Sequence, residues 1–264
     1  LMKMLGITRK VEKKAGEVLK VYKVTGTLAN GTVAEGEVIP LSEYKTTYAP
    51  VGEANLKKWR KQTTAEAISS KGYGQAVNDT NDKMLKDIQK GIRKDFAAFL
   101  ATGSGKATGV GLQAALAQVW GQLQVIWEDT SVEAVYLMNP LDVADYLGGA
   151  QIVTQTAFGM SYIENFLGIG TVILASDVPK GKIYATASEN IVLYFVNVTG
   201  SDLAQAFNLT SDTTGLIGIH TGPVYENLTS ETVAASGVGL FAENLGGVVI
   251  GTITAAEASG TKGK

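Results

Sequence analysis

Apolar residues recur at three- and four-residue steps over residues 81–102, a spacing that predicts a long amphipathic helix. The stripe consists of Leu85, Ile88, Ile92, Phe96 and Phe99. Asp79, Thr80 and Asn81 offer an N-cap, and Gly103 can adopt the left-handed conformation that ends many helices. At about 1.5 Å per residue the helix is about 33 Å long, enough to cross a domain. We expect it to act as a spine.

A second apolar stripe predicts a core helix over residues 111–127. It consists of Leu112, Leu116, Val119, Trp120, Leu123 and Ile126. Residues 132–138 have the composition of a buried strand, and Asn139-Pro140 then combines a cap with a proline suited to the first helical position. A short helix that Gly148 closes should follow.

Strand-forming stretches fill much of the second half of the chain. Three of them predict an antiparallel meander, at residues 171–175, 182–187 and 191–198. β character returns near the end, at residues 216–228, 232–242 and 248–253. Helices and strands in this arrangement predict the α+β class.

The first part of the chain predicts a long hairpin. Its extended stretches are residues 18–26, 44–51 and 56–64. Asn30-Gly31 supplies turn chemistry between the first two. The region has few large apolar residues, so it can hardly form a core of its own and should lean on another structure.

Positive and negative residues are distributed unevenly along the sequence. Residues 1–61 hold 12 Lys and Arg against 6 Asp and Glu, a net charge of +6, and residues 62–106 carry +2. Residues 107–264 hold 4 against 14, a net charge of −10. Complementary regions steer and register contacts, which favours a contact between the front of one copy and the body of another. The pattern therefore predicts self-association.

Lys57, Lys58, Arg60 and Lys61 surround Trp59 and form a compact basic group. Such a group could hold phosphates while the indole stacks on a base, or it could meet an acidic protein surface. Because the chain itself supplies an acidic body, we favour a protein partner over nonspecific DNA contact or plain solvation.

The segment 103–108 superficially resembles a phosphate-binding loop. Leu100 stands where the first glycine is required, and Ala107 stands where Ser or Thr must follow the lysine. The segment also follows a helix rather than a strand. We expect a flexible interdomain loop here and no nucleotide site.

The chain has a single histidine, His220, and no cysteine. The lack of cysteine excludes disulfides, thiolate nucleophiles and sulfur-ligated metals. His220 as a general base would need a nucleophile and an orienting carboxylate, and the sequence identifies neither. A structural role is the better interpretation.

Three groups of carboxylates are candidate sites: Asp79 with Asp82 and Asp87, Asp142 with Asp145, and Glu128 with Asp129. The first lacks the spacing and central glycine of a calcium loop, so helix capping and surface pairs explain it better. For the other two, nothing indicates a cleft, and solvated helix and turn faces explain them. We assign no catalytic, cofactor-binding or metal-binding residue and expect no enzyme.

Five glycosylation sequons occur, at Asn30, Asn78, Asn197, Asn208 and Asn227. No signal peptide or membrane-spanning run accompanies them, so we expect them to be chance triplets and expect no membrane partner. The sequence starts at Leu1, which is compatible with removal of an upstream segment.

Several segments are similar to the major capsid proteins of tailed bacteriophages, the Hong Kong 97-type family, and above all to those of phages of Gram-positive hosts. They are residues 81–88 (NDKMLKDI) leading to 99–103 (FLATG), 136–140 (YLMNP), 158–159 (FG) and 178–185 (VPKGKIYA). Each motif alone is weak, but their order and spacing are more specific. The order of arm, long loop, spine helix, mixed body and final β region extends the resemblance over nearly the whole chain.

The resemblance implies four parts: an N-terminal arm (1–16), an extended loop (17–66), a peripheral domain with the spine helix (67–106 and 216–264), and an axial domain (107–215). In that family the extended loop overlies a neighbouring subunit, and the axial domain surrounds the centres of pentamers and hexamers. Many members lose an N-terminal scaffolding segment to a protease, which fits a start at Leu1. Some join lysine to asparagine covalently between subunits, but no motif here identifies such a pair.

The implied function is structural. Copies would form pentamers and hexamers through head-to-tail contacts and close into an icosahedral head around double-stranded DNA. The expected partners are further copies and, nonspecifically, packaged DNA; a scaffolding segment, a portal and decoration proteins are further candidates. The protein would be made and assembled in the bacterial host cytoplasm and reside in the virion capsid.

Three alternatives stay open. An encapsulin-like compartment has a similar fold but encloses protein cargo; the basic start without a recognisable N-terminal helix favours the phage. An α+β hydrolase or binding enzyme would have to use His220. A secreted surface protein would use the sequons.

Overall fold

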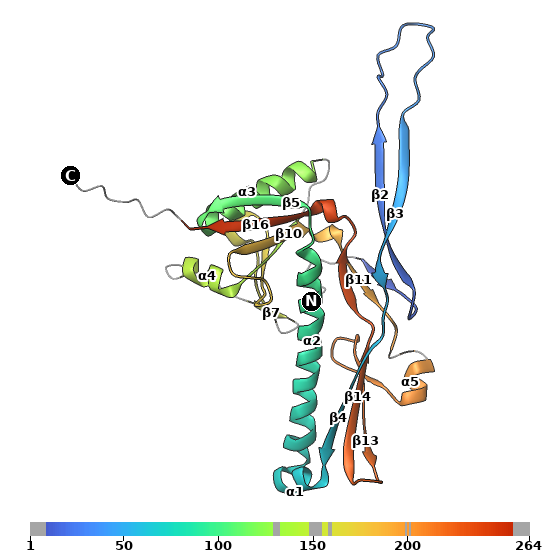
Figure 1. Cartoon of the computed structure of the whole chain (residues 1–264), viewed down its shortest axis with the longest axis vertical. Helices are drawn as coiled ribbons and strands as arrows, with labels where there is room; N and C mark the ends of the chain where they lie inside the picture. Colours follow the sequence, from blue (N-terminus) through green and yellow to red (C-terminus); the bar gives the residue numbers. More distant parts are fainter. Residues whose placement is uncertain are drawn as a thin grey trace, which may run out of the picture.

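The computed structural model describes residues 9–128, 133–147, 155–157, 160–198, 200 and 202–255. Within this part, an elongated body carries a hairpin that extends far beyond it (Figure 1). The sequence features at Leu1, Asp129, Gly148 and Phe158-Gly159 lie outside the described residues.

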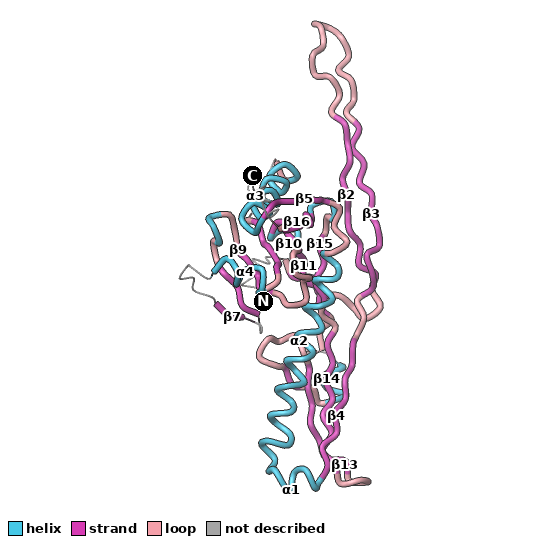
Figure 2. Tube along the Cα trace, turned by 60° about the vertical axis from the view of Figure 1, so that its left-hand side comes forward, coloured by secondary structure: helices cyan, strands magenta, loops and turns pink. Residues whose placement is uncertain are grey.

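The helices are α1 Ala65–Tyr73, α2 Asp79–Leu100, α3 Gly111–Ile126, α4 Pro140–Leu147 and α5 Asp202–Phe207. One π-helical turn, Gly74–Asn78, joins α1 to α2. The predicted spine is therefore confirmed as α2, which runs the length of the lower body (Figures 1 and 2). The predicted N-cap is wrong, because the chain is already helical before Asp79.

A seven-stranded sheet forms the upper body. In spatial order it contains β5 (Gly105–Val110), β16 (Val248–Thr254), β10 (Lys182–Ala187), β6 (Ala134–Met138), β9 (Thr171–Leu174), β8 (Met160–Ile163) and β7 (Gln155–Ala157). The pairs β5–β16 and β6–β9 are parallel, and β10 is antiparallel to both of its neighbours. Helix α3 packs against β5, β16 and β10.

The predicted meander is wrong. Strand β6 lies between β10 and β9, and β11 (Ile191–Phe195) joins a different, three-stranded sheet with β1 (Lys10–Glu12) and β15 (Gly239–Ala242). All five residues of β6 are buried, so the most apolar strand takes a central position between strands that follow it in the sequence. Apolar composition identifies a strand but does not specify its neighbours.

A four-stranded sheet forms the lower body beside α2 (Figure 2). Its order is β12 (Thr210–Ser211), β13 (Gly218–Val224), β14 (Thr229–Ser236) and β4 (Lys57–Thr64). The sequence analysis assigns the residues of β4 to the extended loop. In the structure β4 pairs with β14 along its whole length, from Lys57↔Ser236 to Thr64↔Thr229. The four-part domain division itself stays a prediction.

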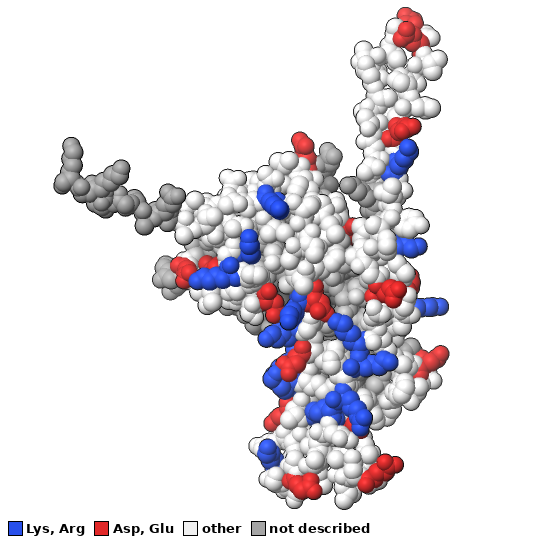
Figure 3. Space-filling view, viewed as in Figure 1, with Lys and Arg blue, Asp and Glu red and all other residues white. Residues whose placement is uncertain are grey.

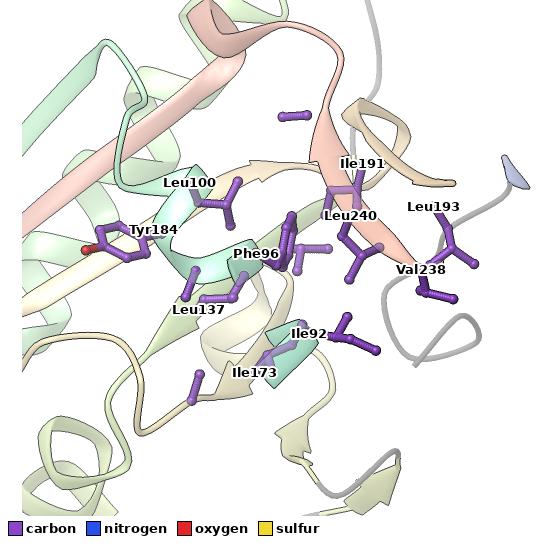
Figure 4. Packing of buried hydrophobic residues seen from close by; sticks show 14 of the residues in the cluster. Ile92, Phe96, Leu100, Leu137, Ile173, Tyr184, Ile191, Leu193, Val238 and Leu240 are labelled. Carbon is purple, nitrogen blue, oxygen red and sulfur yellow. The ribbon is translucent and has the colours of Figure 1, made fainter. Parts of the chain in front are cut away.

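The apolar stripe of α2 forms the centre of one core cluster (Figure 4). Ile88, Ile92, Phe96 and Leu100 are buried, while Leu85 and Phe99 are partly buried. They meet side chains of the seven-stranded and three-stranded sheets, including Leu137, Ile173, Ile191, Leu193 and Leu240. The core thus ties the spine to strands that lie far apart in the sequence.

In α3, Leu116, Val119 and Leu123 are buried in a second core cluster. Trp120 and Ile126, which the stripe also includes, are exposed on the far side, so that part of the prediction is wrong. The helix needs to cover only the sheet, and a stripe of this width reaches beyond it.

The predicted flexible loop at 103–108 is also wrong. Residues from Gly105 onward form β5, paired in parallel with β16. Gly103 does not adopt a left-handed conformation. A Cβ there would lie 2.6 Å from Cγ1 of Val248, so this glycine permits close approach to β16 rather than a helix-ending turn.

Candidate functional site

The hairpin of β2 (Val18–Thr27) and β3 (Glu43–Glu53) is a two-stranded sheet that pairs with no other described strand. Its root is anchored: Leu19 and Ala54 are buried, and the Ala54 amide donates to the Glu17 carbonyl at 2.9 Å. Beyond the root it runs into solvent (Figures 1 and 2). Two-stranded hairpins are marginal in water, so this one depends on a further contact for rigidity.

Residues 28–42 connect the two strands and are called the tip below. Its large apolar side chains are exposed, namely Leu28, Val38, Ile39 and Leu41; the last is 93% accessible. The stretch 28–43 carries Glu35, Glu37 and Glu43 and no Lys or Arg, and acidic side chains mark the end of the hairpin in Figure 3. An exposed apolar segment with acidic flanks is typical of a docking element.

Between root and tip, aromatic side chains support the hairpin. The Tyr44 ring lies against Gly26, its direct cross-strand partner, where a Cβ would collide with the ring. The Lys20 amine lies 5.1 Å from the centroid of the Tyr48 ring, within range of a cation–π contact. These local contacts keep the strands paired without a hydrophobic core.

The basic group around Trp59 is divided by strand geometry. Side chains alternate between the two faces of β4, so Lys57, Trp59 and Lys61 share one face and Lys58 and Arg60 share the other. The compact patch inferred from the sequence therefore does not exist as one surface.

Lys57 and Lys61 face α2. Lys57 forms an ion pair with Asp95, and the Lys61 amine donates to Thr80 and, at 3.2 Å, to the Val77 carbonyl. Burial lowers the pKa of the Lys61 amine. These two cations join the strand to the spine within one chain.

Lys58 and Arg60 lie on the opposite face, away from α2. Arg60 Nε lies 2.6 Å from Glu231 Oε1 on the neighbouring strand β14. Lys58 forms no ion pair with any described residue and is exposed. One cation of the four is thus free to meet a partner.

A groove of about 310 Å³ lies beside these two cations, between β4, β14 and α5. Its lining is mainly apolar and includes Leu56, Leu203, Phe207, Leu209 and Val233. Phe207 is 60% exposed. The sequence analysis missed this groove; the signal in the sequence was the Leu203 and Phe207 pair, spaced by one helical turn.

The candidate catalytic residues do not come together. His220 lies in β13 opposite Val233, and no hydrogen bond joins it to a carboxylate or nucleophile among the described residues. Asp87 pairs with Lys83 on the surface of α2, and Asp79 and Asp82 are also exposed there. The described part of the chain holds no cluster of three or more metal-binding side chains.

The two carboxylates of α4 differ in role. Asp142 is buried, and its Oδ2 accepts from the Gly181 amide at 2.7 Å, so a solvated-face explanation is wrong for this residue. Asp145 is exposed and lies 3.8 Å from Lys180. Nearby, Asn139 Oδ1 accepts from the Leu141 amide at 2.9 Å, which confirms the predicted cap. Asp142 fastens the turn before β10 and does not form an acid–base pair.

No described helix has the length and apolarity that a membrane span requires.

Within the N-terminal arm, β1 pairs in parallel with β11, and Arg9 lies 2.6 Å from Glu243. The described end of the arm is therefore attached to the body.

No protein-family model and no curated protein matches the chain in sequence. Solved structures do match. The capsid of cyanophage P-SCSP1u has a TM-score of 0.58 at 9% identity, covering 97% of this chain and 88% of that one. A chain of Mycobacterium phage Che8 has 0.58 at 12%, covering 89% and 84%. The holo encapsulin complex of Synechococcus elongatus PCC 7942 has 0.57 at 12%, covering 94% and 85%.

These matches span most of both chains, so the likeness concerns the whole architecture and not one motif. The chain has the α+β fold of Hong Kong 97-type capsid proteins, as the sequence predicts. Phage shells and an encapsulin shell share this fold with it.

Proposed function

We propose that this protein is the major capsid protein of a tailed bacteriophage, a structural subunit that assembles with copies of itself into a closed head around double-stranded DNA. The observation that carries the proposal is the unpartnered β2–β3 hairpin with its exposed apolar tip on a capsid fold. A soluble monomer rarely keeps such a segment exposed without a partner.

Two different surfaces support head-to-tail assembly. The hairpin tip is acidic and apolar, whereas the groove beside β4 is apolar with Lys58 and Arg60 next to it. Contacts between unlike patches generate rings when the rotation closes. Pentamers and hexamers arise in this way, and the proposed role is structural and not enzymatic.

The acidic body and basic front also have to be reinterpreted. Lys57, Arg60 and Lys61 have partners within their own chain, so the basic group acts partly in folding. The tip, which belongs to the front of the sequence, is acidic. The charges that match between copies are therefore local, at the tip and at Lys58, and not the net charges of the two halves.

An encapsulin-like shell is the alternative, favoured by the match to the Synechococcus encapsulin over 94% of this chain. The two functions differ in the contents of the shell. Particles purified from the native source and treated with nuclease retain protected double-stranded DNA if the protein is a phage capsid. Protected protein cargo without DNA would favour the encapsulin-like compartment.

Sedimentation velocity of the purified chain at micromolar concentration tests assembly itself. A capsid subunit gives large, discrete species such as capsomers and shells. A strictly monomeric species at every salt concentration, and no particles in native material, would overturn both shell functions.

A further inference from the structure

We propose that Asn30, in the tip of the hairpin, is a self-modification site at which the chain converts its own side-chain amide into a carboxylate without an enzyme. Asn30 is followed by Gly31, and no other asparagine of the sequence precedes a glycine. The inference concerns the single chain and does not depend on the proposed function.

The reaction is intramolecular and consumes one molecule of water. The backbone nitrogen of Gly31 loses its proton and attacks Cγ of Asn30, and the amide nitrogen takes up a proton and leaves as ammonia. The product is a cyclic imide, which water then opens at one of its carbonyls. Breaking the bond to Cγ leaves aspartate, whereas breaking the bond to the backbone carbonyl leaves isoaspartate, in which the chain continues through the side chain.

The attacking nitrogen is accessible. Asn30 and Gly31 are exposed and lie outside the β2–β3 ladder, whose last pair is Thr27↔Glu43, at the far end of the hairpin (Figure 1). The Gly31 amide donates to no other described residue, and a Cβ on Gly31 would meet nothing within 4 Å. Since glycine also has the widest backbone freedom, this nitrogen can turn toward Cγ at little cost.

The side chain of Asn30 is also held in a favourable way. The Thr32 amide donates to Asn30 Oδ1 at 3.0 Å. Negative charge develops on this oxygen when the Gly31 nitrogen adds to Cγ, so the Thr32 amide acts as an oxyanion-hole donor. Across the tip, the Ala29 amide donates to Ser42 Oγ at 3.0 Å, which fixes the residue before Asn30. The reacting groups therefore belong to an ordered loop.

Asn208 provides a contrast within the same chain. It too is exposed, but the amide that follows it, that of Leu209, donates to the Ala204 carbonyl at 3.0 Å. The Leu209 side chain is buried. This nitrogen could attack only after its hydrogen bond and the packing of the leucine were broken, so Asn208 should stay unmodified.

The product changes the charge of the tip and leaves the fold intact. The stretch 28–43 already carries Glu35, Glu37 and Glu43 without a Lys or Arg, and the reaction adds one more negative charge. Neither product disturbs the register of β2 and β3, because residue 30 lies outside their pairs. Acidic chains should therefore accumulate with the age of the protein.

Incubation of the purified full-length chain at mildly alkaline pH, followed by peptide mass spectrometry, tests the proposal. The mass increase of an amide-to-acid exchange should appear at Asn30, at a rate proportional to hydroxide concentration, and not at Asn208. Enzymatic methylation should detect isoaspartate in the same peptide, which direct hydrolysis of the side chain cannot produce. An unchanged Asn30, equal conversion of both asparagines, or aspartate without isoaspartate would overturn the proposal.

Substitutions in the tip test the geometry. Gly31→Ala should slow the conversion by about tenfold, because a methyl group restricts the approach of the nitrogen. Thr32→Pro removes the donating amide and should slow it by about tenfold, whereas Thr32→Ala keeps that amide and should react as the unmodified chain does. Equal rates in the two Thr32 variants, or an unchanged rate in Gly31→Ala, would contradict the proposed arrangement.

Discussion

The side chain of Asn81 in α2 is held by Thr232 of β14, which lies 151 positions further along the chain. Asn81 Oδ1 accepts from Thr232 Oγ1 at 2.9 Å, and its Nδ2 donates to Thr221 Oγ1 of β13 at 3.2 Å. The two threonine hydroxyls are themselves 3.0 Å apart. This network fastens the spine helix to the lower sheet.

Replacing Asn81 with alanine should therefore lower the free energy of unfolding by about 1–3 kcal/mol, because the threonine hydroxyls lose a partner in a partly buried place. Urea denaturation of the dilute, unassembled chain measures the change. Asn78→Ala is a matched control, since the Asn78 side chain is exposed and makes no capping bond. Equal effects of the two substitutions would show that the network contributes little.

The two faces of β4 predict different outcomes for charge reversal. Lys61→Glu places a carboxylate against the Val77 carbonyl and should destabilise the fold by about 1–3 kcal/mol. Lys58→Glu should change the unfolding free energy by less than about 0.5 kcal/mol, since Lys58 is exposed. Thermal or urea unfolding compares them. A uniform effect would mean that the alternation of faces has no consequence for stability.

Reversing Lys57, Lys58, Arg60 and Lys61 together would thus disturb folding as well as assembly. The sequence alone treats them as one patch that acts between copies. The period of two along a strand could have separated them, once residues 57–64 were recognised as a strand with one face on the spine. The sequence alone does not show that one face of this strand packs against α2.

Alanine substitutions at two glycines should change the free energy of unfolding in opposite directions. Gly91 lies inside α2, and a Cβ there would meet nothing within 4 Å, so Gly91→Ala should stabilise the chain by about 1 kcal/mol. Gly103→Ala would place a methyl group 2.6 Å from Val248 Cγ1 and should destabilise it by about 1–3 kcal/mol. Denaturation midpoints compare the two. Two changes of the same sign would contradict this packing.

Substitutions in the exposed tip should impair assembly without changing the stability of the single chain. Val38→Ser with Leu41→Ser should leave the unfolding free energy within about 0.5 kcal/mol, because both side chains are more than 90% exposed in the single chain. The same variant should need a much higher concentration to assemble, since the proposed function buries each of these side chains against another copy.

Light scattering during assembly measures this difference. Leu141→Ser removes an exposed leucine from α4, away from the tip, and should assemble as the unmodified chain does. Normal assembly of the tip variant, or equal impairment of both, would count against the tip as the assembly element.

The elements of the fold that depend on local pattern were predictable. The spine helix follows from a periodicity of 3.6, the hairpin strands follow from their β-branched and aromatic composition, and the Asn139 cap follows from its position before Pro140. The order of the strands was not predictable, because β6, β9 and β10 are all mainly apolar and any two of them could be neighbours. The groove was missed because three separate segments form it.

The central claim is that this chain builds a closed shell. Electron microscopy of the purified full-length chain, at micromolar concentration and over a range of salt, tests it most directly. The account predicts closed particles of uniform size, made of rings in which the hairpin of each copy lies on a neighbour. A field of monomers, or irregular aggregates without rings under every condition and in native material, would contradict it.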